Sequence, residues 1–355
     1  MADPFELWRV AWWTAFSGGL ERLAQISRGG VALALQPRAD AIDLSNLPVL
    51  GRVRLELATM LLVEQRAPAR AKDPPVLIVA PYAFHDASIA DFAEGNSLAQ
   101  VLVEAAPGLI ALTFWKSATA EMRDYGIDAY LSDLNVAIDD LGGSVSLVGL
   151  CQGGWLAAAY AARFPGKVAK LVLAGAPIDL AAAESGITCA LAAVSQTTLE
   201  QVIALAGGWV PGPLALALWS NGPSGEFSAE AALQCVGDAA LVTRFRDWNT
   251  RPVNLPGAYF LQTAEWVFRE NRLARDCFPA LGRQVALSKI TAPIFVLAAA
   301  DDEVVAAPQA TAVKSLCRAA KVVVRVEPGR HLSLFMGRRT LSDAWPEIAR
   351  WLVRK

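Results

Sequence analysis

The residue types in this chain that could do chemistry are a cysteine in a glycine-rich turn, two histidines and a pair of aspartates. Cys151 lies in the segment Gly149-Leu-Cys-Gln-Gly-Gly154, and His85 and His331 are the 2 histidines of the chain. A cysteine becomes a nucleophile when a histidine takes its proton and a carboxylate orients that histidine. His331 follows the apolar run Val322–Val326. The sequence therefore predicts nucleophilic catalysis by Cys151, with His331 as the base.

Two adjacent carboxylates, Asp301 and Asp302, directly follow the apolar run Ile294–Ala299. The chain order cysteine, aspartate, histidine is the order of nucleophile, acid and histidine in the α/β-hydrolase fold. Spacing leaves both aspartates as candidates to orient His331, while the other caps a helix or faces water. A purely structural histidine is the alternative to a catalytic His331. All three positions together favour catalysis.

The segment around Cys151 is typical of a nucleophile elbow, in which a strand turns sharply into a helix. A β-carbon at Gly149 or Gly153 would crowd this reversal, and Gly154 is the third glycine of the elbow. Cys151 then lies at a helix N-terminus, where unpaired backbone N–H groups favour the thiolate. The alternative is a buried structural cysteine in a glycine-flanked turn.

An oxyanion hole in this fold needs two backbone amides. One is the N–H of Gln152, the residue after the nucleophile, and the other comes from the loop after Val76–Val79, where Tyr82 and Ala83 are the candidates. In the same loop His85 is either a polar group on the substrate side or a surface histidine.

Strand-like and helix-like segments alternate along the chain, which predicts an α/β-hydrolase fold with a mostly parallel sheet flanked by helices. We expect a helical arm over residues 1–70, with one apolar stripe from Leu55 to Val63, followed by core segments over 71–180 and 286–355 and a helical cap over 181–285. The strand-like runs are Val76–Val79, Leu109–Phe114, Val145–Val148, Lys170–Ala174, Ile294–Ala299 and Val322–Val326.

The N-terminal arm is rich in tryptophan, with Trp8, Trp12 and Trp13 close together. Such an aromatic amphipathic segment could lie on a lipid-like or polymer surface. Packing onto the body of the protein or onto a second subunit is the commoner outcome.

The composition excludes several classes of protein. A net charge of −2 with 19% charged residues gives no reason to expect nucleic-acid binding. The 5 cysteines are widely and irregularly spaced, so neither disulfides nor a metal site are expected. No secretory signal and no transmembrane segment are expected either. A reducing cytoplasm is the predicted location.

In these motifs the chain resembles the polyhydroxyalkanoate synthases. Gly149–Gly154 is similar to their cysteine-containing lipase box, and the resemblance places Asp302 at the catalytic acid position. It extends over about residues 74 to 355, although Arg251 and Pro252 stand where many synthases carry an aspartate. Further matching segments are Asn96–Leu98, Arg123–Leu131, Trp248–Gly257, Glu270–Leu273 and Leu297–Val305.

The resemblance implies an acyltransferase that polymerises 3-hydroxyacyl-CoA through an acyl group on Cys151. CoA is then part of the substrate, and no separate cofactor is expected. His85, Trp248 and Asn249 are the candidate residues on the substrate side. The implied partners are the growing polyester chain, a second copy or a second synthase subunit, and the surface of polyester granules.

Two alternatives stay open. The loop from Ala80 to His85 also resembles intracellular polyhydroxybutyrate depolymerases, which hydrolyse the polymer with a cysteine in the same fold. Synthesis and hydrolysis differ in whether a hydroxyl group or water attacks the acyl-enzyme. The other alternative is a non-catalytic, granule-associated protein on a hydrolase scaffold.

Overall fold

Buried apolar runs assemble into an 8-stranded sheet in the computed structural model, within the residues that it describes (42, 44–65, 74–105, 108–192, 194–212 and 229–354). The strand order is β1-β2-β6-β3-β7-β8-β13-β14, parallel from β6 to β14 and antiparallel for β1–β2 and β2–β6. The predicted α/β architecture is confirmed. The strands are β1 Leu50–Glu56, β2 Met60–Gln65, β3 Val76–Val79, β6 Ile110–Trp115, β7 Val145–Leu150, β8 Val168–Ala174, β13 Ile294–Ala299 and β14 Val322–Glu327.

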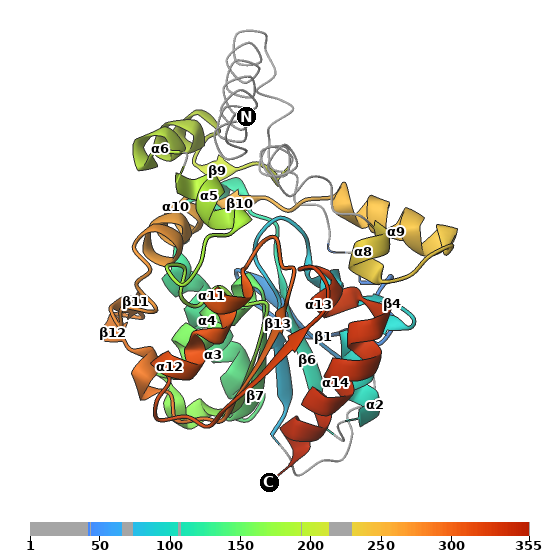
Figure 1. Ribbon diagram of the computed structural model, residues 1–355. Coiled ribbons are helices and arrows are strands. Elements are labelled where there is room, and N and C mark those ends of the chain that lie inside the picture. Colours follow the sequence, from blue (N-terminus) through green and yellow to red (C-terminus); the bar gives the residue numbers. More distant parts are fainter. Residues whose placement is uncertain are drawn as a thin grey trace, which may run out of the picture.

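Helices cover both faces of this sheet, with α2 and α14 on one face and α3, α4, α11 and α12 on the other (Figure 1). In α3 and α14 the buried residues form an apolar stripe, whereas α4 is buried throughout from Gly153 to Ala161. In α3 the buried residues recur every three or four positions, as an amphipathic helix requires. The helices are α2 Leu98–Ala105, α3 Ile127–Asp140, α4 Gln152–Arg163, α11 Ala307–Thr311, α12 Val313–Leu316, α13 Ser333–Met336 and α14 Arg338–Val353.

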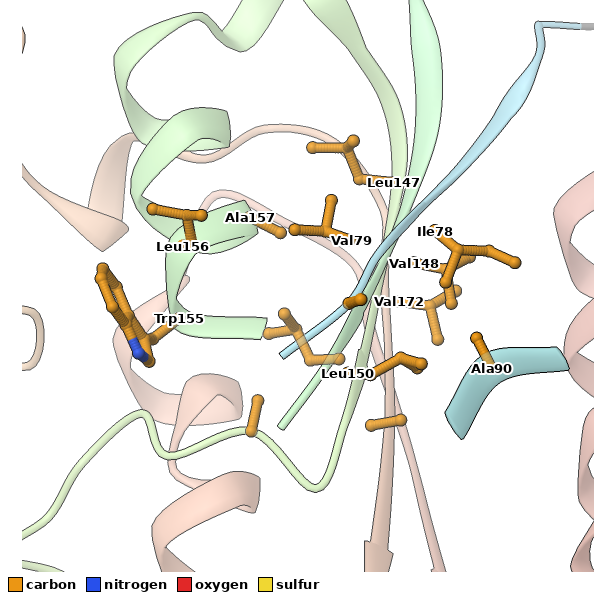
Figure 2. Packing of buried hydrophobic residues seen from close by; sticks show 14 of the residues in the cluster. Ile78, Val79, Ala90, Leu147, Val148, Leu150, Trp155, Leu156, Ala157 and Val172 are labelled. Atoms are coloured by element: carbon orange, nitrogen blue, oxygen red, sulfur yellow. The ribbon is translucent and has the colours of Figure 1, made fainter. Parts of the chain in front are cut away.

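The core lies on both sides of the central strands. Successive residues of a strand point to opposite faces, so Val79 and Leu147 lie toward α4 while Ile78 and Val148 lie on the other side, toward Ala90 (Figure 2). Burial on both faces explains why β3 is apolar throughout and why β7 is apolar apart from Ser146 and Gly149. The site-bearing loops therefore rise from a rigid sheet.

The apolar segment from Leu55 to Val63 is not helical, so this part of the prediction is wrong. It belongs to the antiparallel hairpin of β1 and β2, and the sheet begins at Leu50 rather than after residue 70. β2 is buried throughout between β1 and β6, and a short continuous apolar run has the same appearance in a strand as in a buried helix. The predicted tryptophan-rich arm lies outside the described residues.

Most of the chain between β8 and β13 lies over the carboxyl ends of the parallel strands, whereas its hairpin of β11 and β12 lies beside α3 and α4 (Figure 1). No helix in the described ranges is long and apolar enough to cross a membrane. The elements of this insertion are α5 Gly186–Ala192, α6 Gln196–Leu205, β9 Trp209–Val210, α8 Ala229–Leu233, α9 Ala239–Asn249, β10 Leu255–Pro256, α10 Gly257–Gln262, the π-helix η5 Thr263–Arg269, β11 Phe278–Ala280 and β12 Arg283–Val285.

Candidate active site

Cys151 occupies the sharp turn between β7 and α4. Its backbone has φ 48° and ψ −119°, a left-handed conformation that is strained for a residue with a β-carbon. Its N–H donates to the carbonyl of Ala174 at 2.8 Å, and its carbonyl accepts from the N–H of Gly154 at 2.9 Å. Cys151 is thereby the N-cap residue of α4, in the geometry of a nucleophile elbow.

The elbow glycines let α4 approach its neighbours closely. A β-carbon on Gly149 would lie 2.6 Å from the Cα atom of Gly154, and one on Gly153 would lie 2.1 Å from the carbonyl oxygen of Val79. A β-carbon on Gly154 would lie 2.3 Å from the Cβ atom of Ala176. The clash at Gly153 is with backbone that a rotamer change cannot relieve. This glycine therefore keeps the nucleophile next to the loop after β3.

His331 and Asp302 meet at the carboxyl ends of β14 and β13. The Nδ1 atom of His331 lies 2.8 Å from Oδ2 and 3.0 Å from Oδ1 of Asp302. Both side chains are buried. Oδ1 also accepts from the backbone N–H groups of Val304 at 2.9 Å and Val305 at 2.8 Å, which fixes the carboxylate against the loop. The carboxylate in turn holds the imidazole in one orientation.

The electrostatic environment of His331 favours its protonated form. Burial alone lowers the pKa of His331, but attraction to Asp302 and Cys151, with hydrogen bonds to both side chains, raises the pKa well above its ordinary value. Cys151 and Asp302 thus flank the imidazole as its two polar partners.

The two neighbours of Asp302 behave differently. Asp301 is exposed to solvent, so the structure leaves Asp302 as the partner of His331. Glu303 was not identified from the sequence. Its Oε2 atom accepts from the backbone N–H of His331 at 3.2 Å and lies 3.3 Å from Nε of Arg330. Glu303 therefore fixes the histidine loop, and its position directly after the aspartate pair was the available signal.

Cys151, Gln152 and His331 border a cavity of about 60 Å³. This is room for a short acyl group or a few water molecules. Its wall is largely apolar and includes Phe84, Ile89, Ile187, Trp248, Phe268 and Phe335.

The loop after β3 brings one oxyanion-hole candidate to this cavity. Ala83 and Gln152 both border the cavity. Tyr82 does not border this cavity. Its side chain is buried, and its hydroxyl donates to the carbonyl of Lys116 at 3.0 Å. Of the residues expected to supply amides, Ala83 and Gln152 are therefore the pair that the structure brings together.

His85 is not a surface histidine: it is partly buried and lines the cavity. Its ring stacks on Trp248 at 4.1 Å with an interplanar angle of 25°. Its Nε2 atom lies 3.2 Å from the carbonyl oxygen of Asn249, which requires the proton to be on Nε2. Of the three candidate substrate-side residues, His85 and Trp248 line the cavity, while Asn249 contributes its backbone behind the ring.

The His85 environment predicts a pH-dependent stability. Burial lowers the pKa of His85 from 6.5 to about 4. A neutral buried imidazole stabilises the fold fully above pH 6.5, and this stabilisation is lost as the pH falls from 6.5 toward 4, because only the unfolded chain takes up the proton there. Between pH 7 and pH 4.5 the free energy of unfolding should fall by up to about 3 kcal/mol more in the wild type than in His85→Gln. Denaturant titrations of both proteins measure this difference, and parallel pH curves would contradict it.

The insertion supplies the outer wall of the cavity. Ile187 comes from α5, Trp248 from the end of α9 and Phe268 from η5. Each belongs to a different element of the insertion, so their convergence was not visible in the sequence.

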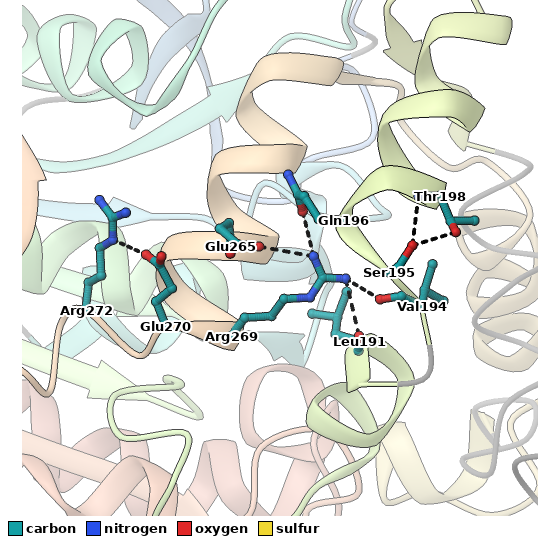
Figure 3. A network of polar contacts seen from close by, with 9 residues as sticks. All are labelled: Leu191, Val194, Ser195, Gln196, Thr198, Glu265, Arg269, Glu270 and Arg272. Carbon is teal, nitrogen blue, oxygen red and sulfur yellow. Dashed lines mark hydrogen bonds and ion pairs between the residues drawn. The ribbon is translucent and has the colours of Figure 1, made fainter.

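Arg269 fastens η5 to the segment that joins α5 and α6 (Figure 3). Its guanidinium donates to the carbonyl of Val194 at 2.5 Å and to Oε1 of Gln196 at 2.6 Å, and it pairs with Glu265 at 3.2 Å. These contacts lie directly beside Phe268 in the chain. The wall over Cys151 is therefore held by a polar network as well as by apolar packing.

The α/β-hydrolase fold family model matches residues 113–337, and the chain belongs to this family. Two solved structures show the same fold. The monoacylglycerol lipase of Paleococcus ferrophilus is 14% identical, with a TM-score of 0.56 and coverage of 83% of this chain and 98% of the lipase. A bromoperoxidase from Bacillus anthracis is 18% identical, with a TM-score of 0.54 and coverage of 86% and 100%.

Curated relatives define the relationship further. A protein of Synechocystis named poly(3-hydroxyalkanoate) polymerase subunit PhaC is 26% identical over 96% of this chain and 90% of the relative. A protein of Haloferax mediterranei with the same name is 24% identical over 80% of this chain, which spans 59% of that relative. These similarities confirm the relationship to polyhydroxyalkanoate synthases that the motifs predicted.

Proposed function

We propose that the chain is an acyltransferase that polymerises 3-hydroxyacyl-CoA into polyhydroxyalkanoate. The observation that carries this proposal is the buried contact of His331 with Asp302, together with the position of Cys151 at the same largely apolar cavity as His331. The relationship to the polymerases supports the same reaction. CoA belongs to the substrate in this reaction, and no further cofactor takes part.

In the first step the Sγ atom of Cys151 attacks the carbonyl carbon of the thioester. The new S–C bond forms, the bond to the CoA sulfur breaks, and CoA leaves with a proton that His331 can supply. The backbone N–H groups of Gln152 and Ala83 are suited to stabilise the intermediate oxyanion. The product is an acyl group on Cys151.

In the second step a hydroxyl group attacks the acyl-enzyme. Nε2 of His331 takes the proton of this hydroxyl while the Asp302 carboxylate holds Nδ1. The new ester bond forms, the S–C bond breaks, and the thiolate of Cys151 is regenerated. The hydroxyl belongs to a 3-hydroxyacyl group, so each cycle lengthens the polyester by one unit.

Synthesis requires that water does not replace the hydroxyl group. The small, largely apolar cavity and the wall formed by the insertion support synthesis over hydrolysis. We propose the surface of polyester granules as one partner. A second copy or a second subunit is a further proposed partner, since the relatives are named as subunits.

The purified chain, given 3-hydroxybutyryl-CoA, should release CoA and form polyester rather than free 3-hydroxybutyrate. Chromatography separates CoA, free acid and polymer, and Cys151→Ala is the matched control. Release of soluble 3-hydroxybutyrate from amorphous polymer, with no CoA liberated from the thioester, would refute synthesis. In that case the intracellular depolymerase reaction is the correct one.

A further inference from the structure

We infer that His85 selects the acyl group: its imidazole accepts a hydrogen bond from the hydroxyl on carbon 3 of the acyl group held by Cys151. This inference rests on the proposed function and names the residue that recognises its substrate class. The first observation is position. His85, Cys151 and His331 line one small cavity, so a short acyl chain bound to Cys151 lies within reach of the His85 ring.

The second observation is that the ring is held in place. Stacking on Trp248, with 4.1 Å between the ring centroids, fixes the plane of the imidazole. The hydrogen bond from Nε2 to the carbonyl oxygen of Asn249, at 3.2 Å, fixes the orientation of the ring within that plane. A residue that positions a substrate must itself be locked by its neighbours. Trp248 and Asn249 end helix α9, so the insertion orients a side chain that the core provides.

The third observation is the chemistry of the ring. Because Nε2 donates to the Asn249 carbonyl, Nδ1 of the neutral ring carries a lone pair. Because His85 lines the cavity, this lone pair can accept a hydrogen bond from a donor on the bound acyl group. Other polar groups line the same cavity. The carboxylate of Asp86 accepts from the N–H of Ser88 at 2.9 Å, and the buried indole N–H of Trp248, which has no hydrogen-bond partner among the described residues, can only donate. Gln152 supplies its N–H next to the nucleophile.

The substrate class follows from this acceptor. A hydroxyl on carbon 3 donates a hydrogen bond, whereas a keto oxygen on the same carbon only accepts, and an unsubstituted chain offers nothing. A site that is built to pair with a hydroxyl rejects analogues that lack it, because its own polar group is then left unpaired. His85 therefore favours 3-hydroxyacyl groups over 3-oxoacyl and plain acyl groups of the same length.

The test measures acylation of Cys151 by p-nitrophenyl 3-hydroxybutyrate and by p-nitrophenyl butyrate. In both reactions the S–C bond forms, the bond to the aryl oxygen breaks and nitrophenolate leaves, so one burst reports one acyl-enzyme. Intact-protein mass identifies the adduct. We expect the wild type to prefer the hydroxy ester, and His85→Phe to lower the ratio of the two acylation rates by about tenfold or more.

Two further variants separate hydrogen bonding from packing. His85→Phe keeps a ring on Trp248 but has no acceptor, whereas His85→Gln has both a donor for Asn249 and an acceptor oxygen. His85→Gln should recover part of the ratio, which a purely structural role would not produce. Asp301→Asn, a change at an exposed residue, is the matched control and should keep the wild-type ratio.

The inference is overturned if the wild type does not prefer the hydroxy ester, or if His85→Phe keeps the ratio within about twofold. The proposed function has its own readout in CoA release. CoA release together with a ratio that is independent of His85 removes the inference alone. A ratio that depends on His85 without any CoA release removes the synthase function and keeps the hydroxyl-binding role.

Discussion

Cys151→Ala should abolish acyl transfer and leave the fold intact. Cys151 is the elbow residue and borders the same cavity as His331, and loss of a nucleophile of this kind costs on the order of 10⁴-fold or more in rate. Alanine fits the space of the thiol, so the thermal midpoint should stay close to the wild-type value. CoA release and the absence of an acyl adduct in the intact-protein mass measure the loss. Cys189→Ala, a change at a half-buried cysteine of the insertion, is the control.

Alkylation provides an independent measure of the same thiol. Burial raises the pKa of the Cys189 and Cys235 thiols, and it raises the pKa of the Cys317 thiol to about 12 with a contribution from the Asp276 carboxylate. These thiols should therefore react slowly with iodoacetamide near neutral pH. Cys151 should be labelled first, and labelling should stop turnover. Equal labelling of all cysteines in the native protein, or normal turnover by Cys151→Ala, would show that the nucleophile is elsewhere.

His331→Ala should reduce turnover by about 10⁴-fold, and Asp302→Asn by about 10³-fold or more. The alanine variant has no base for the attacking hydroxyl. The asparagine variant keeps the shape of the carboxylate but loses the charge that stabilises the imidazolium. Asp301→Asn should stay near the wild type because Asp301 is exposed to solvent. Steady-state CoA release by the three purified variants measures these effects.

The ranking of these variants can contradict the assignment in two ways. A larger loss in His85→Ala than in His331→Ala would move the base to the loop after β3. A larger loss in Asp301→Asn than in Asp302→Asn would move the orienting carboxylate. The buried contact between His331 and Asp302, at 2.8 Å, predicts the opposite order in both comparisons.

The sequence by itself determined the elements that carry the candidate site. The predicted runs Val76–Val79 and Ile294–Ala299 match β3 and β13 residue for residue, because strands buried on both faces leave unbroken apolar segments. The elbow around Cys151 could be predicted because a turn this tight has no space for a β-carbon at positions 149 and 153, where the sequence has Gly149 and Gly153. The order of cysteine, aspartate and histidine followed from the same local patterns.

Only the tertiary structure decided which of these residues meet. It made the segment from Leu55 to Val63 a pair of strands, because pairing with β6 outweighs local helix preference. It separated exposed Asp301 from buried Asp302, and it placed His85 inside the cavity against Trp248. The local pattern of apolar and polar residues predicts the backbone conformation and the buried face of one segment. Contacts between segments far apart in the chain depend on how the elements pack, and one sequence does not record that packing.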